Sequence, residues 1–98
     1  MIKNCKIKPP FFEIGPKSYL CGDDVLDLAL AADAAAEKYD VDIIFTTPVI
    51  DIRRVSEATR RIHVFAPHMD NLRPGRGLAE ILPESLVAAG AEGVMLNH

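Results

Sequence analysis

The amino-acid sequence predicts an α/β domain built around a parallel β-sheet. Short apolar segments alternate with segments of helical periodicity in the order strand, helix, strand, helix, strand, helix, strand. All but one of the connections are short, and alternation at this spacing implies right-handed crossovers between parallel strands. Hydrophobic residues make up 49% of the 98-residue chain, so a single domain can bury a core without disulfides or a metal.

The first strand and the first helix follow one another near the amino terminus. Phe11–Ile14 is a short apolar run that Gly15 and Pro16 end, which is typical of a buried strand. Residues 22–24, Gly-Asp-Asp, supply an N-terminal cap for a helix that ends near Lys38. The apolar positions of this helix recur at three- and four-residue spacing, and they are Val25, Leu28, Ala29, Ala32, Ala35, Ala36 and Tyr39.

A second strand and a short second helix come next. Val41–Thr46 is nearly continuous in its apolar character and Pro48 stops it, so we expect a strand buried on both faces. Asp51 is expected to cap the helix that follows. The inward stripe of this helix is predicted at Ile52, Val55 and Ala58, and its water-facing side at Arg53, Arg54, Glu57 and Arg60.

The last strands are separated by a long connection. Ile62–Ala66 is the predicted third strand, and residues 67–80, rich in proline, glycine and charge, follow it. A loop of that length in a compact domain is usually functional. Pro83 suits the first turn of a third helix, and Gly93–Asn97 is the fourth strand. The buried face of the third helix is predicted at Leu86 and Val87, and its C-terminal cap at Gly90.

The composition argues against several classes of partner. The formal net charge is −3 and the isoelectric point is near 5.5, which gives no electrostatic footprint for nucleic acid or an anionic membrane surface. Cys5 and Cys21 lie apart without metal-ligand spacing, so we expect no disulfide, no metal and a cytoplasmic location. We expect no cofactor, no signal peptide and no membrane span, since no apolar run approaches the roughly 20 residues that a span needs.

Two closures of the sheet fit the strand and helix pattern. One is an open doubly wound sheet, which the length alone favours, and the other is part of an eight-stranded parallel barrel. In both, ligands bind at the carboxyl ends of the strands, so the polar residues just after each apolar run are the candidate site residues. These are Lys17, Thr46, Thr47, His68, Asp70, Asn97 and His98.

Each candidate has a functional and a structural interpretation. Lys17 could hold a phosphate or a developing enolate, or it could be a solvated loop lysine. His98 could act as an electrophile or a proton shuttle, or it could have no chemical role. His68 and Asp70 could orient a ligand or only stabilise their loop. Residues 74–77, Pro-Gly-Arg-Gly, contain the glycines of a phosphate nest but lack the full fingerprint.

Taken together, four segments resemble the triose-phosphate isomerase family, and its archaeal-type members most of all. Gly15–Tyr19 resembles the first-strand Asn-x-Lys segment of the family, and Val64–Asp70 resembles its third-strand segment. Leu82–Glu84 with Ala89–Ala91 resembles the following helix. Gly93–His98 resembles the fourth strand, which in the family ends on an electrophilic histidine.

The resemblance implies a fold and a reaction. Residues 1–98 would form the amino-terminal half of the family's (β/α)8 TIM barrel, with its first four strands, and would take part in aldose–ketose isomerisation of a small sugar phosphate through an enediolate. Lys17 and His98 would be the catalytic residues: Lys17 would bind the substrate and stabilise its charge, while a neutral His98 would polarise the carbonyl. Asn97 and His68 are the further candidate substrate-binding residues.

Departures from the family pattern affect the expected activity. The family's asparagine before the lysine is Gly15 here, and the threonine that reaches into a neighbouring subunit is replaced near Leu78. These two groups interact across the family's dimer, so an altered interface or substrate is expected. The family's catalytic glutamate and its phosphate-gripping loops, which follow later strands, have no counterpart in this chain. We therefore expect the chain to be inactive alone.

Three hypotheses for the function remain open at this point. The chain could be an enzyme segment that needs a complementary barrel half. It could be a non-catalytic half-barrel that forms a homo-oligomer through the edges of its first and fourth strands. It could belong to another phosphosugar barrel, an epimerase or an aldolase, although no Schiff-base lysine stands out within a buried strand.

Overall fold

A four-stranded parallel sheet in the order β1-β2-β3-β4 forms the centre of the computed structural model, which describes residues 6–96 and residue 98. The strands are β1 (Phe11–Ile14), β2 (Asp42–Thr46), β3 (His63–Ala66) and β4 (Gly93–Val94). The connections contain α1 (Asp23–Tyr39), the short 3-10 helix η1 (Val49–Asp51) with α2 (Ile52–Ala58), and α3 (Pro83–Ala89). The predicted α/β class, the element order and the parallel direction of the strands are confirmed.

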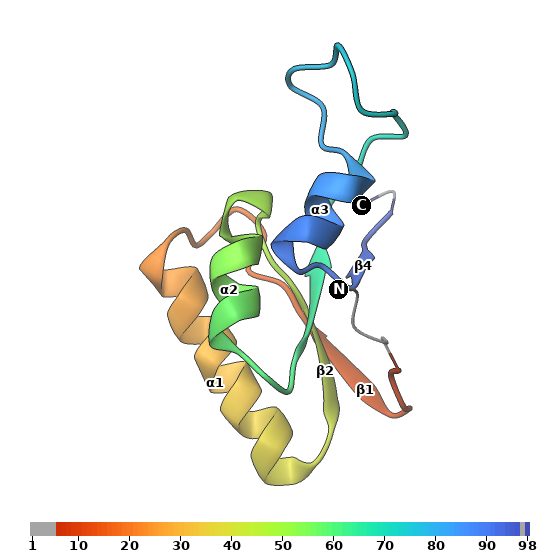
Figure 1. The fold of residues 1–98 in the computed structure, drawn as a ribbon. Coiled ribbons are helices and arrows are strands. Elements are labelled where there is room, and N and C mark those ends of the chain that lie inside the picture. The colour runs from red at the N-terminus through yellow and green to blue at the C-terminus, as the bar shows by residue number, and fades with distance from the viewer. Residues whose placement is uncertain (1–5, 97) are drawn as a thin grey trace.

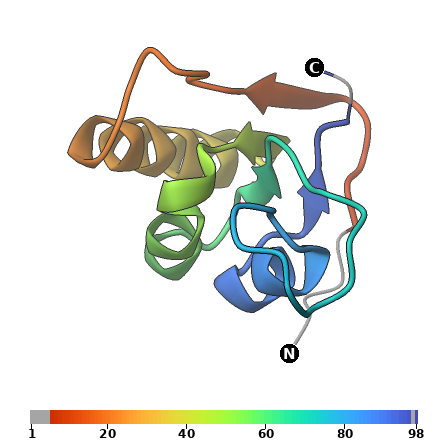
Figure 2. The ribbon, with the colours of Figure 1, turned by 90° about the horizontal axis from the view of Figure 1, so that it is seen from above.

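All three α-helices lie on one side of the sheet. Figure 1 shows α1, α2 and α3 packed in front of the strands, and Figure 2 shows that the sheet curves with the helices on its outer side. This arrangement follows from right-handed crossovers, which place each connecting helix on the same face when consecutive strands are neighbours. The opposite face carries no helix among the described residues.

The core fills the space between the sheet and these helices. Phe45 pairs in register with Ile14 on one side and Val64 on the other, and it is fully buried. Because side chains alternate between faces along a strand, this row points toward the helices. The helices contribute these buried apolar residues to the core: Val25, Ala29, Ala32, Ala36, Ile52, Val55 and Leu86.

Two predictions about strand burial are wrong. Phe11 and Phe12 in β1 are 49% and 58% exposed, because β1 lies at the edge of the sheet. In β2 the helix-facing residues Ile43 and Phe45 are buried, but Ile44 on the opposite face is only half-buried. A single layer of helices covers one face, whereas a strand buried on both faces needs a layer on each side.

Gly22 and Asp51 occupy the N-cap positions of α1 and α2, within the predicted caps, but neither helix has a side-chain hydrogen bond at its N-cap. Gly22, with a φ of 59°, is the N-cap residue of α1 and forms no side-chain cap hydrogen bond, while Asp23 and Asp24 lie within the first turn. Their charges still favour the helix, because the N-terminus carries partial positive charge. The side chain of Asp51 forms no cap bond, and its Oδ2 atom is buried without a partner among the described residues.

The inward faces of the helices are narrower than the periodicity indicates. Ala58 is exposed, and Thr59 is buried in its place, where the hydroxyl donates to the carbonyl of Val55 at 2.8 Å. Tyr39 is 66% exposed in the last turn of α1, with the Lys38 ammonium 5.3 Å from its ring centroid. Val87 is 43% exposed, because only one row of the short α3 reaches the core.

Helix α3 ends at Gly90 as predicted, and β4 is shorter than predicted. Gly90 has a φ of 110°, and its N–H donates to the carbonyls of Leu86 and Val87. Strand β4 pairs with β3 at Gly93 and Val94. Of the rest of the predicted strand, Met95 and Leu96 lie beyond the ladder, and Asn97 is outside the described residues.

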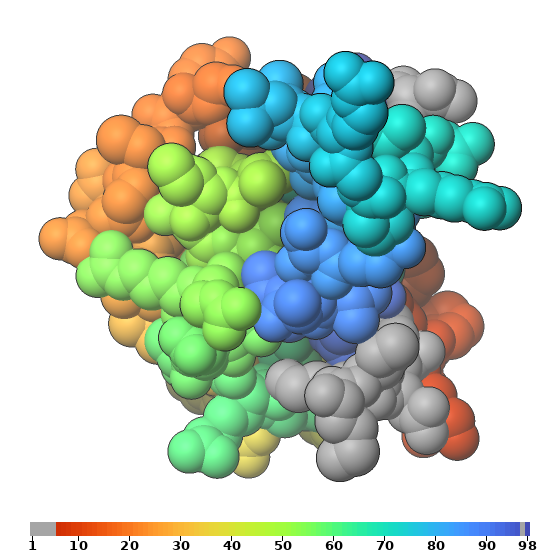
Figure 3. All heavy atoms as spheres, turned by 45° about the horizontal axis from the view of Figure 1, so that its top comes forward, coloured from red at the N-terminus to blue at the C-terminus, as the bar shows by residue number. Residues whose placement is uncertain are grey.

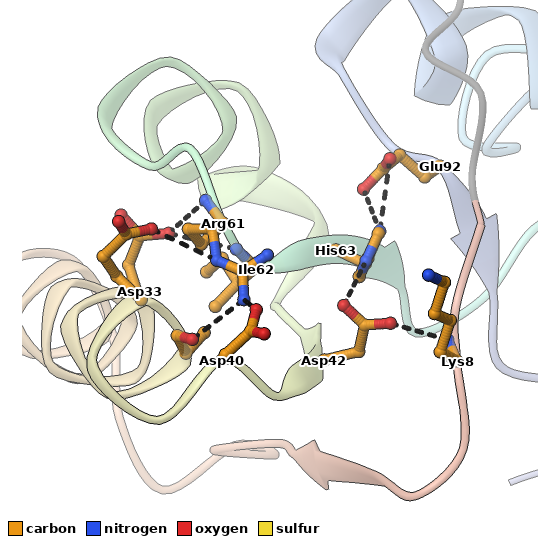
Figure 4. Close-up of polar contacts among 10 residues, drawn as sticks. Lys8, Asp33, Asp40, Asp42, Arg61, Ile62, His63 and Glu92 are labelled. Carbon is orange, nitrogen blue, oxygen red and sulfur yellow. Dashed lines mark hydrogen bonds and ion pairs between the residues drawn. The ribbon is translucent and has the colours of Figure 1, made fainter.

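A carboxylate on α1 anchors the connection between α2 and β3. Asp33 accepts hydrogen bonds from the backbone N–H groups of Arg60, Arg61 and Ile62, at 2.6 to 3.2 Å (Figure 4). The Arg61 guanidinium also donates to the carbonyl of Ala36 at 2.9 Å. These contacts fix the start of β3 relative to α1.

A polar cluster joins the amino ends of the strands. His63 lies between Asp42 and Glu92, with nitrogen–oxygen distances of 3.5 and 3.3 Å (Figure 4). The other oxygen of Asp42 accepts the backbone N–H of Lys8 at 2.6 Å. The cluster therefore ties β2 to β3, to the residue before β4 and to the segment before β1.

This cluster makes stability depend on pH in the acidic range. The pKa of Asp42 is lowered, first by the Lys8 N–H and then by His63. A carboxyl group with a lowered folded-state pKa stabilises the protein above its ordinary pKa, and this contribution is lost as the pH falls through the lowered value. We expect Asp42→Asn to lower the urea midpoint of the chain at pH 6 and to have a smaller effect at pH 3, which is below the ordinary pKa of 3.8. An equal effect at both pH values would contradict this assignment.

Candidate functional site

A pocket lies at the carboxyl ends of the strands, on the rim opposite the Asp42–His63 cluster. Its volume is about 250 Å³. Residues from all four strand ends line it: Glu13, Gly15, Lys17, Ser18, Thr46, Thr47, Pro48, Pro67, Met95 and His98. The fold thus brings Lys17 and His98, which are far apart in the sequence, to one cavity.

The turn after β1 positions Lys17. Pro16 is buried and its carbonyl accepts the N–H of Tyr19 at 3.1 Å, which closes the turn. Lys17 within it has a φ of 53°, a left-handed conformation that is uncommon for a residue with a side chain. Such conformations cluster at functional sites. Its ammonium has no ion-pair partner among the described residues, so it can bind an anion.

His98 reaches the pocket from the end of the chain that follows β4. The N–H of Met95 donates to the carbonyl of Ala66 at 2.8 Å, so hydrogen bonding to β3 continues one residue past the strand. His98 itself is exposed, and neither ring nitrogen has a partner within residues 6–96. An imidazole in this position can donate a hydrogen bond or exchange a proton with a ligand.

Two threonines form the floor of the pocket at the end of β2. The N–H of Thr47 donates to the carbonyl of Phe65 at 3.1 Å, and its hydroxyl donates to the carbonyl of Pro48 at 3.4 Å. Thr46 is 9% exposed, and its Oγ1 atom is buried without a partner among the described residues. A buried hydroxyl without a partner costs free energy, so Thr46 leaves one unsatisfied hydrogen-bonding group beside the pocket.

His68 and Asp70 form the pair that their spacing indicates, but away from this pocket. His68 Nε2 lies 3.0 Å from Asp70 Oδ1, and the other oxygen of Asp70 accepts the N–H of Ile81 at 2.7 Å. The Ile81 N–H and then His68 lower the pKa of Asp70. The pair closes the base of the long connection, and His68 does not line the pocket. Asn97 lies outside the described residues.

The long connection projects from the body of the molecule (Figure 1), and its cyan to light-blue atoms lie over the upper right of the view in Figure 3. Residues 71–80 are all exposed. Neither Gly75 nor Gly77 has a positive φ. A phosphate nest needs successive residues that alternate between right-handed and left-handed backbone conformations. The Glu80 carboxylate accepts the N–H of Leu78 at 3.1 Å, which places a negative charge where a phosphate would bind.

Sequence reasoning missed Glu13 as a lining residue. It concentrated on residues after the apolar runs, while Glu13 lies within β1. The alternation of side chains along a strand would have placed Glu13 and Gly15 on the same face. Within the described part of the chain, no group of His, Cys, Asp or Glu side chains is arranged to hold a metal ion. No helix there is long and apolar enough to cross a membrane.

Comparison with known proteins identifies the family. A family model described as triosephosphate isomerase matches residues 16–98. The chain belongs to the triosephosphate isomerase family. The triosephosphate isomerases of Saccharolobus solfataricus and Sulfurisphaera tokodaii are 34% and 35% identical to it over 94 residues, which cover 94% of this chain and 41% of each relative. The Methanobacterium bryantii protein is 34% identical over 91% of this chain and 40% of its own length.

The chain therefore spans about two fifths of the length of the curated triosephosphate isomerases that it matches. Its four parallel strands, with every helix on one face, agree with the first half of a TIM barrel. In such barrels ligands bind at the carboxyl ends of the strands, where the pocket lies here. The resemblance recognised from the strand-end residues is confirmed.

Proposed function

We propose that residues 1–98 form the amino-terminal half of a barrel that isomerises a small sugar phosphate between its aldose and ketose forms. The observation that supports this function is the pocket at the carboxyl ends of the strands, in which Lys17 and His98 both form part of the lining. A cation and an imidazole in one cavity suit a reaction in which negative charge develops on oxygen. Glycolysis and gluconeogenesis are the corresponding metabolic roles.

The proposed mechanism divides the reaction between the two side chains. The Lys17 ammonium binds the anionic substrate and stabilises the enediolate. A base removes a proton from the carbon beside the carbonyl, while the His98 imidazole hydrogen-bonds to the carbonyl oxygen and moves a proton between the two oxygens. Return of a proton to the neighbouring carbon completes the isomerisation. Asn97 is proposed as a further substrate-binding residue. His68 lies outside the pocket of this chain, so we propose it only as a substrate contact in the completed barrel.

We assign the carbon-directed base to a part of the barrel that this chain does not supply, so the chain alone should be inactive. Its proposed partner is a complementary barrel half, which would cover the helix-free face and pair with β1 and β4. A second copy of the chain is the alternative partner, because the edge strand β1 exposes Phe11 and Phe12. Light scattering distinguishes a symmetric dimer from a monomer that aggregates.

The test supplies the missing half. The chain is co-expressed with the segment of the Saccharolobus solfataricus enzyme that follows the matched region, and the purified complex is assayed with triose and tetrose phosphates. We expect turnover by the complex and none by either part alone. A stable complex without turnover on any of these substrates would refute the proposed function.

Variants of the two proposed catalytic residues should remove this turnover. We expect Lys17→Met and His98→Gln each to lower kcat/KM by about 10²- to 10³-fold, the range typical for loss of one charge-stabilising or proton-transferring group. Lys38→Met, on the exposed end of α1, is the matched control and should leave kcat/KM unchanged. Unchanged kcat/KM in both site variants would show that the pocket is not the active site. His68→Gln tests His68, for which a role in substrate binding predicts a raised KM.

A further inference from the structure

Glu13 lies within β1, and its side chain lines the pocket at the carboxyl ends of the strands. Glu13 and Gly15 are two positions apart, so they point to the same face of the sheet. The Oε2 atom of Glu13 lies 3.0 Å from the position that a Cβ atom of Gly15 would take. The carboxylate therefore fills the space that the absent side chain of Gly15 leaves, in the pocket that Lys17 and His98 also line.

The polar groups on this wall of the pocket have no partners within the described residues. Glu13 forms no hydrogen bond or ion pair with residues 6–96 or 98. Thr46, whose Oγ1 is buried without a partner, lies next to it: its Cβ atom is 3.7 Å from the same Gly15 position. Glu13 is exposed, so its carboxylate is open to the pocket. An ionised carboxylate accepts several hydrogen bonds and donates none, so a ligand that donates hydrogen bonds is the one that complements this wall.

The charges in the pocket define what that ligand can be. Lys17 supplies a cation that suits one anionic group, and Glu13 supplies an anion that repels a second. Hydroxyl groups are neutral donors and can satisfy a carboxylate at low cost. The combination fits a molecule with a single phosphate and free hydroxyl groups.

We propose that Glu13 is a substrate-binding residue that accepts hydrogen bonds from hydroxyl groups of the sugar phosphate. It thereby favours fully hydroxylated phosphates over deoxygenated ones. This inference rests on the proposed function, because it assigns to Glu13 the specificity of the pocket in which Lys17 and His98 would act.

A binding experiment on the 98-residue chain and its complex tests the proposal directly. The probes are glycerol 3-phosphate and 3-hydroxypropyl phosphate, which carry the same phosphate and differ by one hydroxyl group. We expect the protein to bind glycerol 3-phosphate roughly tenfold more tightly by calorimetry, the value of one hydrogen bond to a charged acceptor. Glu13→Ala should bring this ratio close to one, and Glu13→Asp should restore part of it. Glu57→Gln, an exposed carboxylate of α2, is the matched control.

A second variant moves the carboxylate without removing it. In Gly15→Ala the new Cβ atom would lie 3.0 Å from Oε2, so the flexible Glu13 side chain must shift. We expect a reduced ratio of the two affinities with unchanged binding of inorganic phosphate. Circular dichroism confirms that each variant is folded. Equal affinities for the two probes in the unsubstituted protein, or a ratio that survives Glu13→Ala, would overturn the proposal.

Kinetics of the complex separate binding from proton transfer. Glu13→Ala should raise KM roughly tenfold with a smaller change in kcat and an unchanged pH profile. A large loss of kcat with loss of the acidic limb of that profile would mean that Glu13 is the base, and would overturn the binding role. If the unsubstituted complex shows no turnover, the proposed function fails, whereas the ratio of affinities still decides the role of Glu13.

Discussion

Asp33→Ala is expected to lower the free energy of unfolding by about 3 kcal/mol, because it leaves backbone donors without their acceptor. The carboxylate accepts the N–H groups of Arg60, Arg61 and Ile62, and the last two are partly buried. Water can replace the acceptor at Arg60, where the bond is exposed, but less completely at the other two. The loss is therefore concentrated at the start of β3.

Urea unfolding of the chain measures this loss, with two comparison variants. Asp33→Asn keeps one acceptor oxygen and should lose about half as much, since a neutral acceptor forms weaker hydrogen bonds. Asp27→Ala, at an exposed position of α1 where the carboxylate has no partner among residues 6–96 and 98, should change stability by less than about 0.5 kcal/mol. Amide hydrogen exchange at Ile62 should accelerate in Asp33→Ala more than exchange in the centre of β2. A loss no larger than that of Asp27→Ala would refute the anchoring role.

Gly90→Ala should be destabilising by a similar amount, about 3 kcal/mol, from two separate causes. The φ of 110° is one that side chains rarely adopt, and the added Cβ would lie 2.0 Å from Ser56 Oγ and 2.6 Å from Ser56 Cβ. Ser56 belongs to α2, so relief of the overlap requires α2 and α3 to separate. The effect on the thermal unfolding midpoint is the quantity to measure.

Two other glycines separate these causes. Gly22 has a φ of 59°, and a Cβ added there would meet no other described residue within 4 Å except its chain neighbours, so Gly22→Ala incurs the backbone cost alone. Gly75 has no positive φ, and a Cβ added there would contact no described residue beyond its chain neighbours, so Gly75→Ala should be neutral or slightly stabilising. Adding Ser56→Gly to Gly90→Ala should recover the steric part of the loss. Additive effects of these two substitutions would contradict direct contact between α2 and α3 at this point.

The order and direction of the strands could be predicted because the periodicity changes at each element. The burial of those elements could not, since an apolar run gives no information on how many layers cover it. β1 is the clearest case: Phe11 and Phe12 look like core residues, and the sheet places them at an edge. The role of Asp33 was equally hidden, because its partners are backbone groups 27 to 29 residues further along the chain.

The candidate site was predicted in part. The rule that polar residues follow parallel strands found Lys17, His98 and the threonines, since it depends only on where each apolar run stops. It failed for Glu13, which precedes the end of its strand. It also included His68, which does not line the pocket of this chain and lies 3.0 Å from Asp70.

The two ends of the sheet carry different polar groups, and this separation affects which substitutions the fold can tolerate. The cluster around His63 holds the strands together at one end, while the cavity with Lys17 lies at the other. A substitution that alters ligand preference therefore need not disturb the contacts that hold the strands in place. Loops around the cavity can diversify for new substrates while the opposite end preserves the scaffold.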